Sequence, residues 1–194
     1  MNVCPGGLSD FDQLEVDSDS GLVTPARFVP SPNFDDRPEN TTVEVLIIHA
    51  ISLPPNCYGD HYIEDLFTNA LDPNQHPYFV DICDLRVSAH FLIDRLGRLI
   101  QFVPTTKRAW HAGVSSFQGR TQVNDFSIGI ELEGCDDDVF EDIQYDCLSK
   151  LSRGLMSGYP ALSPKTIVGH SDIAPGRKTD PGPHFDWPRY LSSL

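Results

Sequence analysis

The chain has 194 residues, of which 40% are hydrophobic, a share that supports a folded core and excludes wholesale disorder. It carries 28 Asp and Glu against 14 Lys and Arg, which gives a formal net charge of −14. Binding to nucleic acid or to acidic membranes is therefore not expected, because neutralising phosphates requires an excess of Lys and Arg. No stretch approaches the ~18 apolar residues of a transmembrane helix, and the length predicts a single domain.

The first 20 residues contain five acidic side chains and no Lys or Arg. A secretory signal needs a basic start and an apolar run of about 7–15 residues, so we expect a cytoplasmic protein. The five cysteines are odd in number and form no C-x-x-C pair, which favours reduced thiols over a disulfide framework. Residues 1–24 show no apolar period and are predicted to be a flexible acidic tail, which leaves residues 25–194 as the folded domain.

The spacing of apolar residues predicts the first strands and helix. Residues 43–49 are β-branched and apolar on both faces, as in a central strand covered on both sides. A helix is predicted after Asp60, a suitable N-cap. Its apolar stripe repeats every three to four residues and consists of Ile63, Leu66, Phe67, Ala70 and Leu71. Residues 88–93 and 99–103 are typical of two strands of a hairpin that turns at Gly97.

The second half of the chain continues this alternation of strands and helices. Residues 126–133 alternate between an apolar face and a face that carries Ser127, Gly129, Glu131 and Glu133, which predicts a strand. A long helix is predicted over residues 140–157, a short strand over 166–170, and a last helical turn capped by Asp186. Together these elements predict an α/β (α+β) fold with a mixed central β-sheet flanked by helices.

Two histidines, His49 and His170, end predicted strands. Ligands collect at strand ends in α/β sheets, so these imidazoles are candidate metal ligands. A catalytic zinc needs a third protein ligand. Asp180, in the proline-stiffened segment 177–183, offers a carboxylate, with Lys178 on the same side of an extended chain. Independently satisfied histidines and an exposed Lys/Asp loop are the alternatives that the pattern leaves open.

Glu131 is the candidate general base, because the small residues on its strand face suit the floor of a cleft. The pattern leaves open that this face meets water, and it does not separate Glu131 from Glu133. Of the other histidines, His90 is expected to be packed and hydrogen-bonded. His111 is expected to lie on the substrate side of the site.

Several motifs together resemble one known family: residues 87–90 (VSAH), 107–113 (KRAWHAG), 124–131 (NDFSIGIE) and 177–183 (RKTDPGP). From about residue 26 to its end, the chain resembles the zinc N-acetylmuramoyl-L-alanine amidases, whose fold is shared by peptidoglycan recognition proteins and the phage T7 amidase. Residues 51–55 (ISLPP) and 66–68 (LFT) narrow the resemblance to the AmpD-type 1,6-anhydro-N-acetylmuramoyl-L-alanine amidases of bacterial cytoplasm.

The resemblance implies a site. Zn²⁺ is the implied cofactor, with His49, His170 and Asp180 as its ligands. Glu131 is the implied general base, and Lys178 is expected to face the oxyanion. Arg86, Trp110 and Arg177 are expected to line the substrate groove, and His111 is placed there as well. Ala50 departs from the family pattern, because members often carry asparagine after the first zinc histidine; the change bears on substrate contacts and not on zinc.

The resemblance also implies a reaction. It is hydrolysis of the amide between 1,6-anhydro-N-acetylmuramic acid and L-alanine in small muropeptides, as a step of peptidoglycan recycling that lowers β-lactamase induction. A monomer that binds neither nucleic acid nor membrane is expected. The alternatives are a non-catalytic module of the same fold that recognises peptidoglycan fragments, and a zinc peptidase that cuts the stem peptide.

Overall fold

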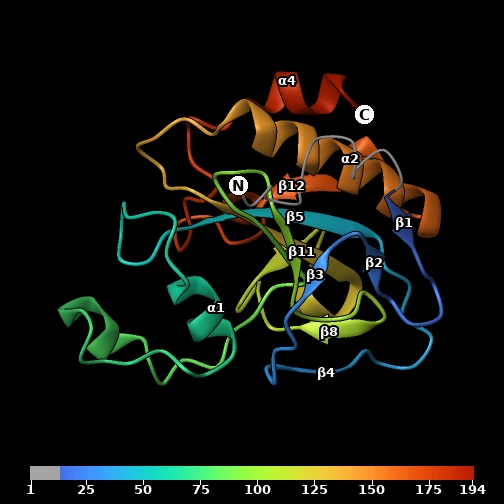
Figure 1. Cartoon of the computed structure of the whole chain (residues 1–194). Helices are drawn as coiled ribbons and strands as arrows, with labels where there is room; N and C mark the ends of the chain where they lie inside the picture. Colours follow the sequence, from blue (N-terminus) through green and yellow to red (C-terminus); the bar gives the residue numbers. More distant parts are fainter. Residues whose placement is uncertain (1–13) are drawn as a thin grey trace, which may run out of the picture.

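A mixed six-stranded sheet forms the centre of the molecule in the computed structural model, which describes residues 14–194 (Figure 1). Its strands lie in the order β12 (Ile167–Gly169), β5 (Val45–Ile51), β11 (Ser127–Glu133), β6 (Phe91–Ile93), β7 (Leu99–Gln101) and β3 (Arg27–Phe28). The first four run parallel to one another, β6 and β7 form the antiparallel hairpin, and β3 is parallel to β7. The predicted α/β class with a mixed central sheet is confirmed.

Shorter elements surround this sheet. Three further strand pairs are β1 (Glu15–Val16) with β2 (Val23–Thr24), β4 (Phe34–Asp36) with β8 (Lys107–Ala109), and β9 (Ser116–Phe117) with β10 (Arg120–Thr121). The α-helices are α1 (Tyr62–Phe67), α2 (Asp142–Gly158), α3 (His170–Ile173) and α4 (Trp187–Ser192). Single turns of 3-10 helix are η2 (Pro77–Asp81), η3 (Val123–Phe126) and η4 (Pro164–Thr166).

Helix α2 covers one face of the sheet, and α4 packs beyond it (Figure 1). The side chain of Gln144, in the first turn of α2, donates to the carbonyl oxygens of Ile93 at 3.2 Å and Glu133 at 3.0 Å, which ties the helix start to the sheet. Its buried side chains, Cys147, Leu148, Leu151 and Leu155, pack against alternate residues of the central strands, Leu46, Ile48, Ile128, Ile130 and Leu132. The predicted long helix is confirmed, and Asp186 caps α4 by accepting from the backbone N–H of Arg189 at 3.0 Å.

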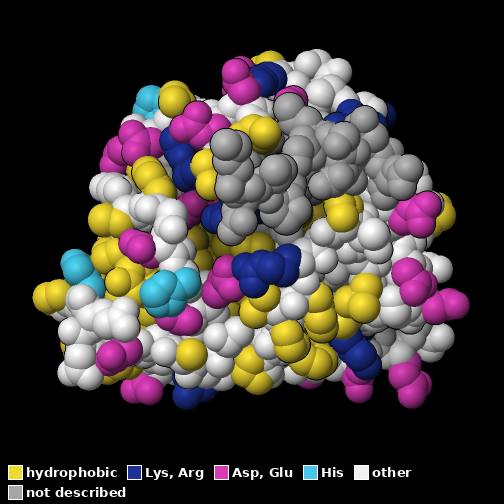
Figure 2. Space-filling model, in the orientation of Figure 1, with side chains coloured by type: hydrophobic (Ala, Val, Ile, Leu, Met, Phe, Trp, Pro, Cys, Tyr) yellow, Lys and Arg dark blue, Asp and Glu magenta, His cyan; other side chains and the backbone are white. Residues whose placement is uncertain are grey.

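The opposite face carries α1 and η2. Hydrophobic side chains gather on the α1 side of the face shown in Figure 2, while acidic side chains are spread around its rim. Helix α1 is shorter than predicted: it follows His61, Asp60 does not cap it, and it ends at Phe67. Asn69 takes φ of 60°, a left-handed conformation through which a right-handed helix does not continue.

Strand β11 is buried along its whole length. On the face that alternation assigns to small and polar residues, Ser127 is 0% exposed, Glu131 8% and Glu133 3%. The alternative in which this face meets water is therefore wrong. The His111 ring lies over Gly129 and contacts Ser127, and the backbone N–H groups of Gly59 and Arg95 reach Glu133, contacts that local alternation does not reveal.

The boundary predicted for the flexible tail, residue 24, does not match the structure. β1 pairs antiparallel with β2, and Val23 is 3% exposed in the core cluster on the α2 side. The carbonyl oxygen of Gly21 accepts hydrogen bonds from the Gln101 side chain at 2.8 Å and the Thr105 backbone at 2.9 Å. Two-residue strands are too short to show a period, so the pattern missed them. Residues 1–13 lie outside the described part of the chain.

The four cysteines in residues 14–194, Cys57, Cys83, Cys135 and Cys147, are free thiols. Cys4 lies outside the described residues. Within residues 14–194, no helix has the length and apolar character needed to cross a membrane.

Candidate functional site

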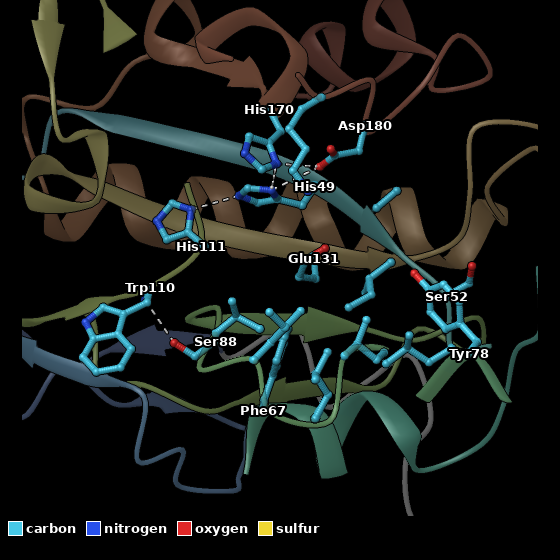
Figure 3. A pocket seen from close by; sticks show the side chains of 18 residues that line it. His49, Ser52, Phe67, Tyr78, Ser88, Trp110, His111, Glu131, His170 and Asp180 are labelled. Atoms are coloured by element: carbon cyan, nitrogen blue, oxygen red, sulfur yellow. Dashed lines mark hydrogen bonds and ion pairs between the residues drawn. The ribbon is translucent and has the colours of Figure 1, made fainter. Parts of the chain in front are cut away.

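A cleft of about 310 Å³ opens beside the carboxyl ends of β5 and β11 (Figure 3). One wall is apolar and comes from α1, η2 and neighbouring loops: Leu53, Leu66, Phe67, Tyr78, Ile82, Leu85 and Val87. The other wall is polar and contains His49, Glu131, His170, Lys178 and Asp180. Ligand sites in proteins commonly combine an apolar lining with a few convergent polar groups, so this cleft is the candidate active site.

His49, His170 and Asp180 converge in the polar wall (Figure 3). His49 lies on β5, and His170 begins α3 directly after β12, the neighbouring parallel strand. The two Nδ1 atoms are 3.0 Å apart, and Oδ2 of Asp180 lies 3.2 Å from Nδ1 of His49 and 3.1 Å from Nδ1 of His170. The two histidines therefore contact each other and Asp180, and do not each have separate hydrogen-bond partners. Asp180 lies in the cleft wall and not in an exposed loop.

The contacts on the outer side of the two imidazoles indicate where their hydrogens lie. Nε2 of His49 is 2.9 Å from Nδ1 of His111, and Nε2 of His170 is 3.2 Å from the carbonyl oxygen of Ala112. We assign the hydrogen of His170 to Nε2, because a carbonyl only accepts and this contact is shorter than the 3.4 Å between the same nitrogen and the Arg177 guanidinium. Nδ1 of His170 then points a lone pair at the centre. With the hydrogen of His49 on Nε2, all three atoms that meet at the centre, Nδ1 of His49, Nδ1 of His170 and Oδ2 of Asp180, are acceptors. Two imidazoles and a carboxylate around such a point fit a divalent cation such as Zn²⁺.

The ionisation of these residues also suits a metal. Burial lowers the pKa of His49 to about 4 from 6.5, so its imidazole is neutral at physiological pH. Burial alone would raise the pKa of Asp180, but its hydrogen bonds with His170 and His49 outweigh that effect and hold the pKa well below its usual range. A neutral imidazole and an ionised carboxylate are the forms that bind metal ions.

Glu131 forms the floor of the cleft beside these three residues. It is the register partner of His49 across β11 and β5, so both side chains leave the sheet on the same face. Its Oε2 atom is buried and has no hydrogen-bond partner within residues 14–194. Burial, aided by the charge of Asp180 and opposed by Lys178, raises the pKa of Glu131 well above its usual range. A buried carboxylate with a raised pKa is suited to accept and return a proton.

Glu133, the alternative base, is held by the fold. Its Oε1 accepts the backbone N–H of Gly59 at 2.6 Å, and its Oε2 accepts that of Arg95 at 3.0 Å. It does not line the cleft. Its carboxylate joins the loop before α1 and the turn of the β6–β7 hairpin to β11, so of the two glutamates only Glu131 is placed for chemistry.

Lys178, Trp110 and His111 line the cleft, where the sequence analysis places them. The ring of His111 nevertheless points into the protein, where Nδ1 contacts His49 and Nε2 lies 3.1 Å from Oγ of Ser127. Neither ring nitrogen of His111 is left for a substrate. The substrate contact expected of this residue is therefore not supported.

Arg86 and Arg177 do not line the cleft, in contrast to the expectation. Arg86 is exposed, and its guanidinium lies 3.3–3.5 Å from carbonyl oxygens within residues 83–85. The Arg177 guanidinium donates to the carbonyl oxygens of Ala112 at 2.7 Å and Val114 at 2.8 Å, so it holds the loop behind His49 and His170.

Two parts of the site leave little trace in the sequence. The apolar wall includes Tyr78 and Leu85, which lie on η2 and the turn after it, where no period marks them. Asn124 accepts the backbone N–H groups of His111 at 3.2 Å and Ala112 at 2.8 Å through its side-chain oxygen. In the sequence, only the position of Asn124 within the 124–131 motif pointed to a role for this residue. Ala50 lies at the wall of the cleft and also packs at the edge of the core cluster below α2.

Comparison with known families agrees with this geometry. Two imidazoles, a carboxylate and a buried glutamate in one cleft at the strand ends form the arrangement of a hydrolase active site. Residues 39–183 match the family model described as N-acetylmuramoyl-L-alanine amidase. The chain belongs to the N-acetylmuramoyl-L-alanine amidase family.

Within the family, the chain is similar to AmpD proteins. It is 53% identical over 178 residues to the 1,6-anhydro-N-acetylmuramyl-L-alanine amidase AmpD of Haemophilus influenzae, covering 92% of this chain and 97% of that one. A crystal structure of a Se-Met AmpD derivative matches with a TM-score of 0.88 and 53% identity over 91% of this chain and 98% of that one. The structure of Escherichia coli AmiD, solved with anhydro-N-acetylmuramic acid-L-Ala-D-gamma-Glu-L-Lys, matches with a TM-score of 0.57 and 31% identity. The match covers 81% of this chain and 60% of that one. The resemblance to the AmpD-type amidases is confirmed.

Proposed function

We propose that this chain is a zinc-dependent amidase that hydrolyses the bond between 1,6-anhydro-N-acetylmuramic acid and L-alanine in muropeptides. The observation that carries the proposal is the buried Oε2 of Glu131, which has no hydrogen-bond partner among residues 14–194 and lies in the same cleft as His49, His170 and Asp180. Similarity to AmpD proteins supports it, as does similarity to AmiD, which was solved with an anhydromuramoyl peptide.

His49, His170 and Asp180 would hold the zinc ion. When bound, zinc supplies Lewis acidity, which polarises a carbonyl and acidifies water. The protein contributes fixed ligand directions, because His170 donates its outer hydrogen to a backbone carbonyl and so keeps its lone pair aimed at the centre.

Glu131 moves the proton. Its Oε2 takes a proton from the attacking water and passes it to the nitrogen of the departing L-alanine, as the bond from the lactyl carbonyl carbon to the new oxygen forms and the C–N bond breaks. Lys178, in the wall of the same cleft, presents a positive charge to the developing oxyanion. A preorganised group of this kind is worth about 3–4 kcal/mol in related hydrolytic sites.

In the cell, this reaction would be a step of peptidoglycan recycling in the cytoplasm, carried out by a monomer. Removal of anhydromuropeptides would also lower the signal that induces β-lactamase. A small muropeptide as partner is consistent with a chain of net charge −14, which disfavours nucleic acid.

Mass spectrometry of an anhydromuropeptide after incubation with zinc-loaded protein tests the proposal. The expected products are anhydro-N-acetylmuramic acid and the free stem peptide, absent with Glu131→Gln. Intact substrate that stays bound to the zinc-loaded wild-type protein would indicate a recognition module instead. Cleavage between two peptide residues would indicate a stem peptidase, and either result contradicts the proposal.

A further inference from the structure

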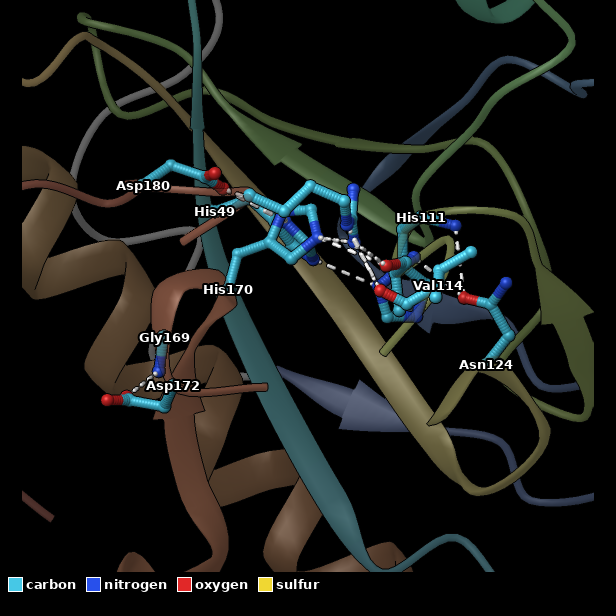
Figure 4. A network of polar contacts seen from close by, with 10 residues as sticks. His49, His111, Val114, Asn124, Gly169, His170, Asp172 and Asp180 are labelled. Atoms are coloured by element: carbon cyan, nitrogen blue, oxygen red, sulfur yellow. Dashed lines mark hydrogen bonds and ion pairs between the residues drawn. The ribbon is translucent and has the colours of Figure 1, made fainter. Parts of the chain in front are cut away.

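Two adjacent residues, His111 and Ala112, contact the outer nitrogens of both histidine ligands (Figure 4). Nδ1 of His111 lies 2.9 Å from Nε2 of His49. The carbonyl oxygen of Ala112 lies 3.2 Å from Nε2 of His170. One dipeptide, on the loop after β8, therefore meets two ligands that are 121 residues apart in the sequence.

The contacts from His49 through His111 to Ser127 allow only one placement of hydrogens if Nδ1 of His49 points its lone pair at a cation. Nε2 of His49 then carries the hydrogen and donates it to Nδ1 of His111. His111 in turn carries its own hydrogen on Nε2 and donates it to Oγ of Ser127, at 3.1 Å. His111 is thus a neutral acceptor behind His49, the place that a carboxylate or a carbonyl commonly takes behind a metal-bound histidine.

The dipeptide is itself fixed. The side-chain oxygen of Asn124 accepts both of its backbone N–H groups, and Arg177 donates to the carbonyl oxygen of Ala112 at 2.7 Å. The His111 ring packs directly over Gly129 of β11, in a space that we call the seat of the ring. A Cβ atom at that glycine would lie 2.5 Å from Cγ and Nδ1 of His111, a separation that real Cβ contacts do not show.

We propose that His111 is a positioning residue for the metal, which fixes the lone pair of His49 toward the centre through a relay that ends at Ser127. This inference rests on the proposed zinc site and extends it. It replaces substrate contact as the role of His111. Groups that orient a metal-bound histidine typically contribute about 10–100-fold to metal affinity.

The test measures zinc affinity by competition with a chromophoric chelator, without any assay of catalysis. His111→Phe keeps a ring in the seat but removes the acceptor, and should weaken zinc binding about 10–100-fold. His111→Asn restores an acceptor near the place of Nδ1 and should recover most of the affinity. Ser127→Ala removes the last hydrogen bond of the relay and should cost about 2–10-fold. His184→Phe is the matched control, because this exposed histidine lies outside the cleft, and it should bind as wild type does.

A second measurement reports the ligand geometry. In Co²⁺-substituted protein, His111→Phe should shift the visible ligand-field bands, whereas His111→Asn should leave them close to those of wild type. If His111→Phe does not fold, His111→Ala, which empties the seat without a clash, takes its place in both measurements.

Wild-type affinity and an unchanged Co²⁺ spectrum in His111→Phe would overturn the positioning role while leaving the zinc site intact. A wild-type protein that binds neither metal would overturn the proposed function and this inference with it.

Discussion

Glu131 and Glu133 are two residues apart on the same face of β11, yet their surroundings are opposite. Glu133 accepts two backbone N–H groups, whereas Oε2 of Glu131 has no partner in the described part of the chain. Burying an unpaired carboxylate costs stability, and such costs are common where a group is kept for chemistry.

The two glutamates should therefore respond differently to substitution by glutamine. Glu131→Gln should raise or preserve the free energy of unfolding while lowering kcat about 10²–10⁴-fold, the usual contribution of a general base. Glu133→Gln replaces one acceptor oxygen by an NH₂ group that faces a backbone N–H, and should cost about 1–3 kcal/mol of stability. Thermal unfolding and turnover, measured on both variants, check this. A larger loss of turnover in the folded Glu133→Gln protein would reverse the assignment.

At this scale, the sequence predicted which polar residues come together better than it predicted the role of each. The apolar runs before His49 and His170 marked both residues, because residues toward the carboxyl ends of parallel strands meet on one side of the sheet. In the structure β5 continues two residues past His49, to Ile51. The choice between the glutamates depends on backbone groups of Gly59 and Arg95, 74 and 38 residues away. The orientation of the His111 ring depends likewise on contacts that no local pattern contains.

Among the elements, the N-terminal hairpin is the one that composition conceals. An acidic stretch with no apolar period carries Val23 into the core, and Leu14 and Val16 lie against α2, where a Cβ at Gly154 would be 2.4 Å from Cδ2 of Leu14. The glycine in the helix thus makes room for the hairpin. Helix α1 shows the converse, since its apolar stripe runs past the point where Asn69 ends the helix.

Two truncations measure the contribution of the β1–β2 hairpin to stability apart from that of residues 1–13. Deleting residues 1–24 should lower the free energy of unfolding by about 2 kcal/mol or more, since full burial of one Val side chain is worth about 1.5–3 kcal/mol. Deleting residues 1–13, which leaves the paired strands β1 and β2 in place, is the control against which this loss is measured. Chemical denaturation of both truncated proteins checks the expectation. Equal stability of the two would mean that the hairpin contributes nothing to the fold.

For the whole molecule, the meeting of three acceptor atoms at one point predicts that a metal stabilises the fold. Zinc at 100 times its dissociation constant adds about 2.7 kcal/mol, which for a chain of this size raises Tm by about 5–11 °C. Asp180→Asn should reduce the shift, and Mg²⁺ should produce none, because it prefers oxygen ligands. Differential scanning calorimetry with and without chelator measures it. An identical Tm under both conditions would contradict the metal site.

The buried histidines also predict acid sensitivity. Burial, together with the Arg37 guanidinium 3.2 Å from Nε2 and the more distant His49, lowers the pKa of His90 to about 3 from 6.5. Between these values the unfolded chain binds a proton that the folded chain does not. Stability is therefore complete above about pH 6.5 and falls as pH decreases, by at most about 1.4 kcal/mol per pH unit for this group.

His90→Gln should reduce that slope. Glutamine retains an acceptor and a donor for the two backbone contacts of the ring, which are the Gly129 N–H at 3.0 Å and the Lys107 carbonyl oxygen at 3.1 Å. His184→Gln, on the surface, should leave the slope unchanged. Unfolding free energies measured from pH 4 to 7 decide the matter. An unaltered slope in His90→Gln would show that the acid response comes from elsewhere.

Because the His111 ring fits over Gly129 only in the absence of a Cβ atom there, the residues at positions 111 and 129 constrain each other in evolution. A side chain larger than hydrogen at 129 would collide with the imidazole, and a small residue at 111 would leave the space over Gly129 unfilled. Neither position can change alone without loss. Across the descendants of a common ancestor, the two should therefore be kept together or replaced together, and a lineage that has given up the glycine should also have given up the histidine.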